Sequence, residues 1–245
     1  LSVRLLSQQE WAVYGIAVLF GLMIGSFVNV VVFRLPKGIP VEADNGKWPI
    51  LGGRSKCPAC GYTIRWYENI PVFSFLWLKG RCSGCRESIS LRYPLIEILV
   101  ATLAVLIVWY FGTTWEAMAR FAFCCLLLAL TLIDLDHFIL PDALTLPAIW
   151  GGLFINAFEF LAPAQEAILG AACGWGSLAA INAVYKIISG QDGIGRGDWK
   201  FAAAIGAWLG YTDLLSAVFI AFLTGAIVGT AILMGNRGDR RTLIP

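Results

Sequence analysis

The sequence predicts an all-α polytopic membrane protein with about seven transmembrane helices and a small cytoplasmic zinc-ribbon-like insert between helices 1 and 2. Three observations lead to this fold class. The 245 residues are 58% hydrophobic and 14% charged, with a mean hydropathy of +0.74, which is far too apolar for an ordinary soluble domain. The apolar residues form separate runs of roughly 20, the length that a spanning helix needs. Four cysteines gather in the one long polar stretch.

Each predicted span is one such apolar run, with an isolated charge allowed near an end. The first contains no charged residue and is too long for the core of a signal peptide, so we expect it to be retained. The sixth would rise only about 22 Å as a helix and begins at an aspartate, which indicates a water-accessible site. The predicted spans are 11–33, 94–113, 115–134, 142–161, 165–188, 198–212 and 214–236.

Several predicted spans carry pairs of glycines four residues apart. Glycines at this spacing let two helix backbones approach closely inside a membrane. The pairs are Gly21 with Gly25, Gly170 with Gly174, Gly206 with Gly210, and Gly225 with Gly229.

The basic residues predict the orientation of the chain. The stretch from Arg34 to Arg92 holds ten of the 18 lysines and arginines. If this insert is cytoplasmic, seven spans place sixteen of the 18 on that side and leave only Arg4 and Arg120 outside. Because lysine and arginine in short loops favour the cytoplasm, the N-terminus is predicted outside and the C-terminus inside. The net charge of +2 indicates no particular partner, and no nucleic-acid partner is expected.

The four cysteines of the insert form two CxxC pairs, Cys57 with Cys60 and Cys82 with Cys85, separated by 21 residues. This spacing predicts one zinc ion held by two knuckles, and Gly61 and Gly84 suit the tight turns of such knuckles. Disulfides are the alternative, which a cytoplasmic location disfavours. Four thiolates leave no open coordination position, so the zinc is predicted to be structural.

Aspartates mark the ends of two predicted spans. Asp134, Asp136 and Asp142 lie around the end of the third span, and Asp198 opens the sixth within a glycine-rich stretch. Ionisable residues in such positions are costly and often functional. Both clusters are predicted on the cytoplasmic side, where two carboxylates can share a proton and activate a water, as in aspartic proteolysis. Helix caps, interface charges or a proton or cation pathway are the alternatives, and His137, the one histidine, is expected to be an ordinary interfacial residue.

The ordered set of motifs resembles the bacterial prepilin peptidases, or type IV leader peptidases, of the GxGD class of intramembrane aspartic proteases. The match spans nearly the whole chain. It rests on the two CxxC pairs, Gly25–Pro36, Asn69–Ser74, Ile89–Glu97, Asp134–Asp136 with Leu140–Asp142, and Gly195–Asp198.

This resemblance implies removal of the basic leader from type IV prepilins or type II secretion pseudopilins, with cleavage after glycine on the cytoplasmic side. By family motif the catalytic pair is Asp134, seven residues before Pro141, together with Asp198. Asp136 is the rival for the first role; its position two residues on points it to another face if the helix continues that far.

For bifunctional members the resemblance also implies N-methylation of the new N-terminal residue with S-adenosylmethionine as methyl donor. The complete cysteine set is similar to that of these members, and Glu97 is a carboxylate to test for substrate or donor contact. The implied division is 1–33 as first transmembrane helix, 34–93 as zinc-binding insert and methyltransferase part, 94–236 as protease core, and 237–245 as cytoplasmic tail.

Expected partners are prepilin and pseudopilin precursors and membrane lipid, in a bacterial inner membrane. The alternatives are a peptidase without methyltransferase activity, a proton- or cation-coupled transporter, and a zinc-bearing scaffold for an assembly machine.

Overall fold

The computed structural model describes residues 8–36 and 54–235, and over these residues it consists of helices without a β-strand. The predicted all-α class is therefore confirmed. Predictions that concern residues 1–7, residues 37–53 of the insert and the tail 237–245 lie outside the described residues. The chain divides into two compact units, Leu1–Leu132 and Ile133–Pro245, called unit 1 and unit 2 below.

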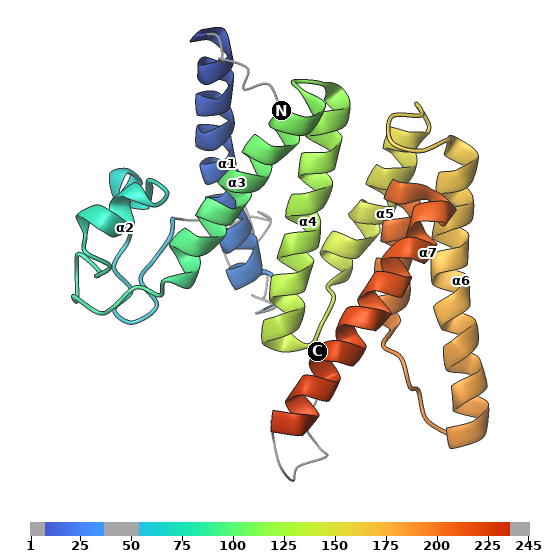
Figure 1. Ribbon diagram of the computed structural model, residues 1–245. Coiled ribbons are helices and arrows are strands. Elements are labelled where there is room, and N and C mark those ends of the chain that lie inside the picture. The colour runs from blue at the N-terminus through green and yellow to red at the C-terminus, as the bar shows by residue number, and fades with distance from the viewer. Residues whose placement is uncertain (1–7, 37–53, 236–245) are drawn as a thin grey trace, which may run out of the picture. The chain divides into compact units, whose positions relative to one another are not determined.

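Unit 1 is built on two long helices, α1 (Gln8–Arg34) and α3 (Arg92–Phe111), which pack against each other (Figure 1). Between them the chain forms a small insert with η1 (Trp66–Asn69) and α2 (Phe73–Trp77). Helix α4 (Trp115–His137) follows, and its last residues belong to unit 2.

Glycines set the close contact between α1 and α3. A Cβ atom on Gly21 would lie 2.5 Å from the Cα of Ala101, and one on Gly25 would lie 2.7 Å from the Cα of Glu97. Both distances are too short for any side chain, so the two backbones touch where the sequence predicted a close helix contact.

Unit 2 contains α5 (Asp142–Asn156), α6 (Ala164–Ser189) and α7 (Arg196–Gly235). Here too glycines bring two backbones together, because a Cβ on Gly174 would lie 2.5 Å from the carbonyl oxygen of Ala202. Gly170 and Gly206 face each other in the same α6–α7 contact. Gly225 has open space around it, so the prediction for this glycine is wrong within the described chain.

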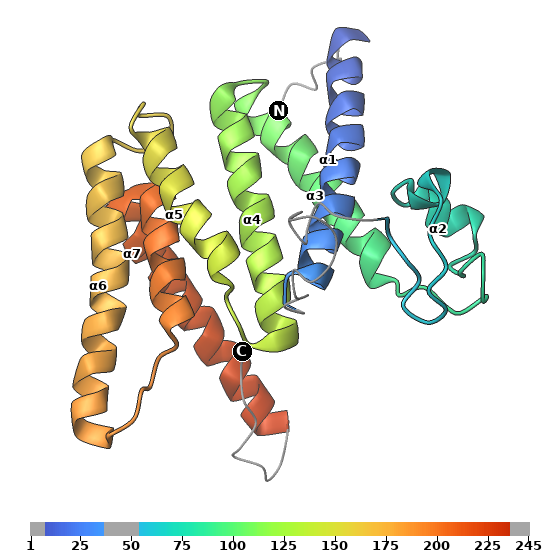
Figure 2. The same ribbon diagram turned by 180° about the vertical axis from the view of Figure 1, so that it is seen from behind.

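Helix α7 is broken at Gly210, where φ is 81° and ψ is 172°. The chain turns back at this point, so that the two halves of α7 form a helical hairpin (Figures 1 and 2). The break removes helical partners from nearby carbonyl groups. The buried Asn156 replaces them, since its amide donates to the carbonyls of Ala207 at 2.8 Å and Trp208 at 3.0 Å. A side chain on Gly210 would also meet Glu166 at 3.2 Å.

Five helices among the described residues are long and apolar enough to cross a membrane: Trp11–Arg34, Arg92–Phe111, Trp115–His137, Ala164–Ser189 and Arg196–Ile227. The predicted count of about seven differs from this in two places. The fourth predicted span corresponds to α5, which has only 15 residues and ends at Asn156 rather than at residue 161. The sixth and seventh correspond to the two halves of α7, which divide at Gly210.

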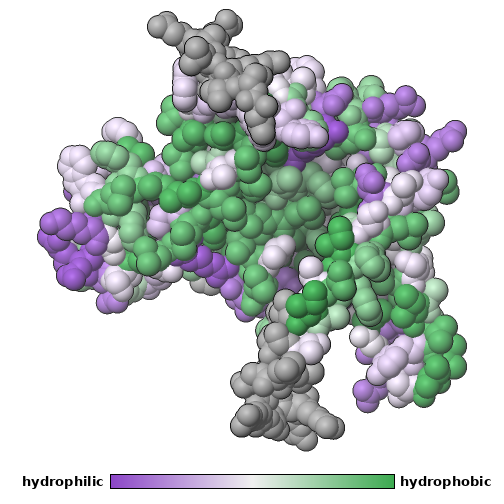
Figure 3. Space-filling view, in the orientation of Figure 1, coloured by the Kyte–Doolittle hydropathy of each residue, from purple (hydrophilic) through white to green (hydrophobic). Residues whose placement is uncertain are grey.

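The surface of these helices is strongly apolar. Large side chains such as Trp109, Trp150 and Ile187 are exposed to more than two thirds of their area, at 69%, 71% and 84%. On the face drawn in Figure 3, hydrophobic side chains cover most of the helical surface. Apolar surface of this extent is typical of helices in contact with lipid.

We expect Gly206→Leu to destabilise unit 2, because the leucine must enter the backbone of α6 at Gly170. Overpacking of this kind costs roughly 1–3 kcal/mol and more where backbone cannot move. Thermal unfolding in detergent micelles measures the effect. Gly225→Leu places the same side chain on the same helix in open space and serves as the control. Equal melting temperatures for the two variants would contradict the packing described for α6 and α7.

Candidate functional site

The predicted catalytic aspartates lie on two helix ends of unit 2. Asp134 is in the last turn of α4, and Asp198 is in the first turn of α7. Figure 1 shows the α4–α5 connection and the segment before α7 toward the same lower side of unit 2. The Asp198 carboxylate is close enough to Asp134 to experience its charge. The structure therefore brings together two residues that are 64 positions apart in the sequence.

Two contacts on either side of the aspartates join these helix ends. Gly197 lies against Leu140 of the α4–α5 connection, where an added Cβ would be 2.9 Å from the Leu140 Cβ. The Lys200 ammonium donates to the Asp142 carboxylate at 2.6 Å. The ion pair is partly exposed, so it contributes more to the register of the two segments than to stability.

Each glycine of the Gly195–Asp198 motif has its own steric reason. A Cβ on Gly195 would lie 3.1 Å from Oδ2 of Asp198, because the carboxylate folds back over this residue. The backbone N–H of Asp198 donates to the Gly195 carbonyl at 3.1 Å and fixes that turn. Gly197 leaves room for Leu140, as described above. The motif therefore lets one chain segment and one carboxylate approach where side chains would block them.

The side chain of Asp136 lies on a face of α4 other than that of Asp134. Helix α4 continues through His137, so a residue two positions after Asp134 points to a different face of the helix. Asp136 and His137 are both exposed. This geometry favours Asp134 over Asp136 as the partner of Asp198.

A buried asparagine anchors the loop that leads to Asp198. Asn182 of α6 accepts hydrogen bonds from the backbone N–H groups of Gly193 at 2.8 Å and Ile194 at 3.0 Å. Its amide donates to Asp192 at 3.0 Å, and Lys186 pairs with the same carboxylate at 3.1 Å. The hydrogen bond from Asn182, with the charge and hydrogen bond of Lys186, holds the pKa of Asp192 below its ordinary value. Sequence reasoning missed Asn182, although a polar residue inside an apolar span is a signal for such a role.

Replacing Asn182 with leucine is expected to lower the rate of the reaction predicted at Asp198 by roughly 10-fold or more, since small displacements of a reacting group carry large kinetic costs. Substrate turnover by the purified variant, separated into kcat and KM, is the measurement. Ser177→Ala in the same helix is the control, because Ser177 bonds only to its own helix at Gly174. A variant with wild-type kcat would show that the Asn182 contacts do not position Asp198.

The four predicted zinc ligands meet in unit 1. Sγ atoms of Cys57, Cys60, Cys82 and Cys85 all lie within 4.8 Å of one another, and those of Cys57 and Cys85 are 3.9 Å apart. Tetrahedral zinc with Zn–S bonds of about 2.3 Å separates sulfurs by about 3.8 Å. All four cysteines are free of disulfides. The residues therefore fit a Cys₄ zinc site.

The two knuckles share one backbone pattern. In the first knuckle, the carbonyl of Cys57 accepts the N–H of Gly61, and the N–H of Cys57 donates to the carbonyl of Tyr62. In the second, the carbonyl of Cys82 accepts the N–H of Arg86, and the N–H of Cys82 donates to the carbonyl of Glu87. Backbone N–H groups of Cys60 and Ala59 lower the pKa of the Cys57 thiol to about 7, which favours the thiolate that binds metal.

The prediction that Gly61 and Gly84 suit the tight turns of the knuckles is confirmed by a positive φ for Gly61 but not for Gly84. Gly61 has a φ of 72°, and the equivalent residue of the second knuckle is Arg86 with a φ of 63°. Gly84 does not have a positive φ; it instead makes room for the ring of Tyr62, which would lie 3.1 Å from an added Cβ.

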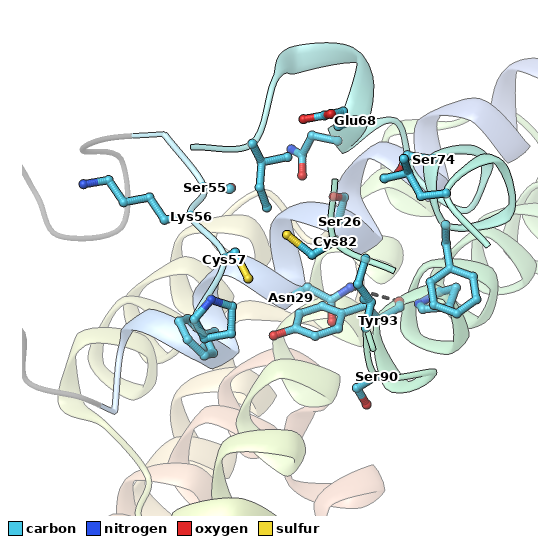
Figure 4. Close-up of a pocket in the computed structure, with 18 of the residues that line it drawn as sticks. Ser26, Asn29, Ser55, Lys56, Cys57, Glu68, Ser74, Cys82, Ser90 and Tyr93 are labelled. Atoms are coloured by element: carbon cyan, nitrogen blue, oxygen red, sulfur yellow. Dashed lines mark hydrogen bonds between the residues drawn. The ribbon is translucent and has the colours of Figure 1, made fainter. Parts of the chain in front are cut away.

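A cavity of about 420 Å³ lies beside this cluster, within unit 1. It is bounded by the end of α1, both cysteine knuckles, α2 and the beginning of α3 (Figure 4). Cys57 and Cys82 line one part of its wall, and Glu97 of α3 lines another. Its size is that of a small-molecule site.

The chain is similar to known proteins over nearly its whole length. The family described as "Bacterial Peptidase A24 N-terminal domain" matches residues 19–111, and the "Type IV leader peptidase family" matches residues 121–230. A protein named "Prepilin leader peptidase/N-methyltransferase" from Aeromonas salmonicida (strain A449) is 40% identical over 251 residues, which cover 96% of this chain and 86% of that protein. Proteins of the same name from Stutzerimonas stutzeri, 37% identical over 99% of this chain and 89% of theirs, and from Pseudomonas aeruginosa, 40% identical over 93% and 83%, are also similar. No solved structure matches the chain significantly.

Proposed function

Since the chain belongs to the type IV leader peptidase family, we propose that it removes the leader peptide from prepilins with Asp134 and Asp198 and then methylates the new N-terminus. Related pseudopilins of type II secretion are the second substrate class. One observation carries the assignment of the two aspartates. The contacts of Leu140 with Gly197 and of Asp142 with Lys200 hold two distant aspartate clusters at one place in unit 2.

The proposed peptidase mechanism needs only the two carboxylates and a water. Two close carboxylates share one proton, so the pair contains an acid and a base together. The ionised carboxylate takes a proton from the water, whose oxygen attacks the peptide carbonyl, while the protonated carboxyl donates its proton to the carbonyl oxygen. Return of a proton to the amide nitrogen then breaks the C–N bond and releases the leader.

The position of the aspartates suits a substrate that is itself a membrane helix. With its apolar segment in the bilayer and its basic leader in the cytoplasm, a prepilin presents the scissile bond near the membrane surface. A peptide bond inside a helix is shielded by its hydrogen bonds, so cleavage requires an extended segment. Cleavage after glycine is proposed from the family resemblance, and glycine before the bond lowers the cost of unwinding. Asp136, exposed beside the site, is an acidic group that can meet the basic leader.

The second activity is proposed for unit 1. S-adenosylmethionine, when bound, supplies the methyl group from its sulfonium to the neutral amine of the new N-terminus. The cavity beside the cysteine cluster has the size for such a molecule. The Cys₄ zinc is structural in this proposal, because four thiolates leave no open position for a reacting group.

The proposed location is the bacterial inner membrane, with several spans. The five long apolar helices support this location. We propose that the zinc insert, the aspartates and the C-terminus all face the cytoplasm, since sixteen of the 18 basic residues then lie on that side.

The test is a time course with purified protein, a leader-bearing pilin and labelled S-adenosylmethionine. We expect free leader to appear first and methylated pilin to follow. Methylation of pilin that still carries its leader would contradict the proposed order. Failure to release any leader would refute the assignment as a prepilin peptidase.

A further inference from the structure

Three glutamates line the cavity of unit 1, and one of them, Glu97, is buried. Glu97 lies on the second turn of α3 and is only 8% exposed. Its carboxylate accepts the backbone N–H of Val72 at 2.8 Å and a hydrogen bond from Ser26 of α1. A buried carboxylate is costly unless such partners hold it, and it is retained chiefly where it has a task.

The residue that Glu97 holds is conformationally strained. Val72 has a φ of 59° and a ψ of −48° at the start of α2. Positive φ is a genuine outlier for a β-branched residue, and such outliers persist where surrounding contacts fix them, often at ligand sites. Here the fixing contact is the Glu97 carboxylate. The acid and the strained backbone together shape one wall of the cavity.

The rest of the wall offers chemically distinct surfaces. Tyr93 also lines the cavity, and Figure 4 shows its ring near Asn29, whose amide donates to the Tyr93 carbonyl at 3.1 Å. Lys56 lies at the edge next to Cys57 and is exposed. The cavity therefore combines a buried acid, an aromatic face and a basic group within about 420 Å³.

These surfaces match one small molecule that the reaction requires. S-adenosylmethionine carries a flat adenine, a ribose diol, a sulfonium, an ammonium and a carboxylate. An aromatic face receives a flat base, a carboxylate accepts hydrogen bonds from a diol or binds a cation, and an exposed lysine pairs with a carboxylate.

We propose that this cavity is the methyl-donor site, with Glu97 as the buried acceptor for the donor and Tyr93 as the face for its adenine. The inference rests on the proposed methyltransferase function and places it at named residues. It also connects the zinc site to donor binding, because the predicted ligands Cys57 and Cys82 form part of the cavity wall. Donor binding then depends on the folded knuckles although the metal touches no reacting atom.

The test measures binding of S-adenosylhomocysteine to the full-length, zinc-loaded protein in detergent micelles by equilibrium dialysis. We expect Glu97→Gln to weaken binding at least about 10-fold, as expected for loss of a charged hydrogen-bond partner. Tyr93→Leu keeps apolar bulk, removes the aromatic face and is expected to weaken binding several-fold. Glu116→Gln is the matched control, because Glu116 pairs with Arg120 at 3.2 Å on α4 and does not line the cavity. Zinc content and thermal unfolding report whether each variant is folded.

Wild-type binding that Glu97→Gln and Tyr93→Leu leave unchanged would overturn the inference while leaving the proposed methylation intact. Photo-crosslinking of labelled S-adenosylmethionine to the wild-type protein decides the case if a variant does not fold. Label on peptides that line the cavity, within residues 26–34 or 54–97, supports the site, and label elsewhere overturns it. A wild-type protein that neither binds S-adenosylhomocysteine nor methylates cleaved pilin would refute the proposed methyltransferase function itself.

Discussion

Asp198→Asn is expected to lower leader cleavage by roughly 10⁴-fold, because removal of one member of an acid–base unit disables the whole unit. Asparagine retains the size of the side chain but can neither share nor transfer the proton. Asp134→Asn should have an effect of the same order. The measurement is release of leader from a purified pilin precursor, with membrane insertion of each variant verified.

Asp213→Asn is the matched control for this experiment. It makes the same change in the same helix, on the other side of the Gly210 break. We expect cleavage by this variant at the wild-type rate. Full cleavage by the Asp198 variant would remove that residue from the mechanism, and an inactive Asp136 variant beside an active Asp134 variant would reverse the assignment within α4.

Removal of the zinc is expected to abolish donor binding and to lower methylation by roughly 10-fold or more, with a smaller effect on cleavage. Among residues 54–91 of the insert only Cys57 and Cys82 are buried, and structural zinc supplies much of the folding free energy in small domains with so little core. Cys57→Ser should act in the same way, because Cys57 contributes both to the metal cluster and to the cavity wall. Elemental analysis should give about one zinc per wild-type chain.

Cys173→Ser is the control for the cysteine experiment, since Cys173 is free, exposed and located on α6 of the other unit. Metal-free protein with a folded insert and normal methylation would contradict the structural role of the zinc. A Cys173 variant that lost methylation as completely as the Cys57 variant would show that the effect is not specific to the zinc ligands.

The fold could be predicted from the sequence wherever a local pattern carries it. Long apolar runs predict α1, α3, α4 and α6, because a single run is long enough to span a bilayer. The short α5 is set instead by distant partners. The sequence predicts a division of α7 between residues 212 and 214, and its observed place at Gly210 depends on such partners. Asn156 caps carbonyl groups 51 and 52 residues away, and no local pattern around Gly210 reveals that contact.

The candidate sites divide in the same way. The CxxC spacing predicts a metal cluster, and the structure confirms that the four thiols meet. The steric reasons for Gly195 and Gly197 depend on the Asp198 carboxylate and on Leu140, so they became visible only in three dimensions. The roles of Asn182 and of the strained Val72 also could not be predicted locally, since each forms its hydrogen bond with a residue of a different segment.

The most direct test of two separate sites uses an Asp198→Asn variant supplied with pilin that has already lost its leader. We propose cleavage at Asp134 and Asp198 in unit 2 and methylation at the cavity and cysteine cluster in unit 1. With labelled S-adenosylmethionine, we expect this variant to methylate the cleaved pilin at the wild-type rate while leaving the uncleaved precursor intact. A folded variant that performs neither reaction would show that the two activities do not have separate sites.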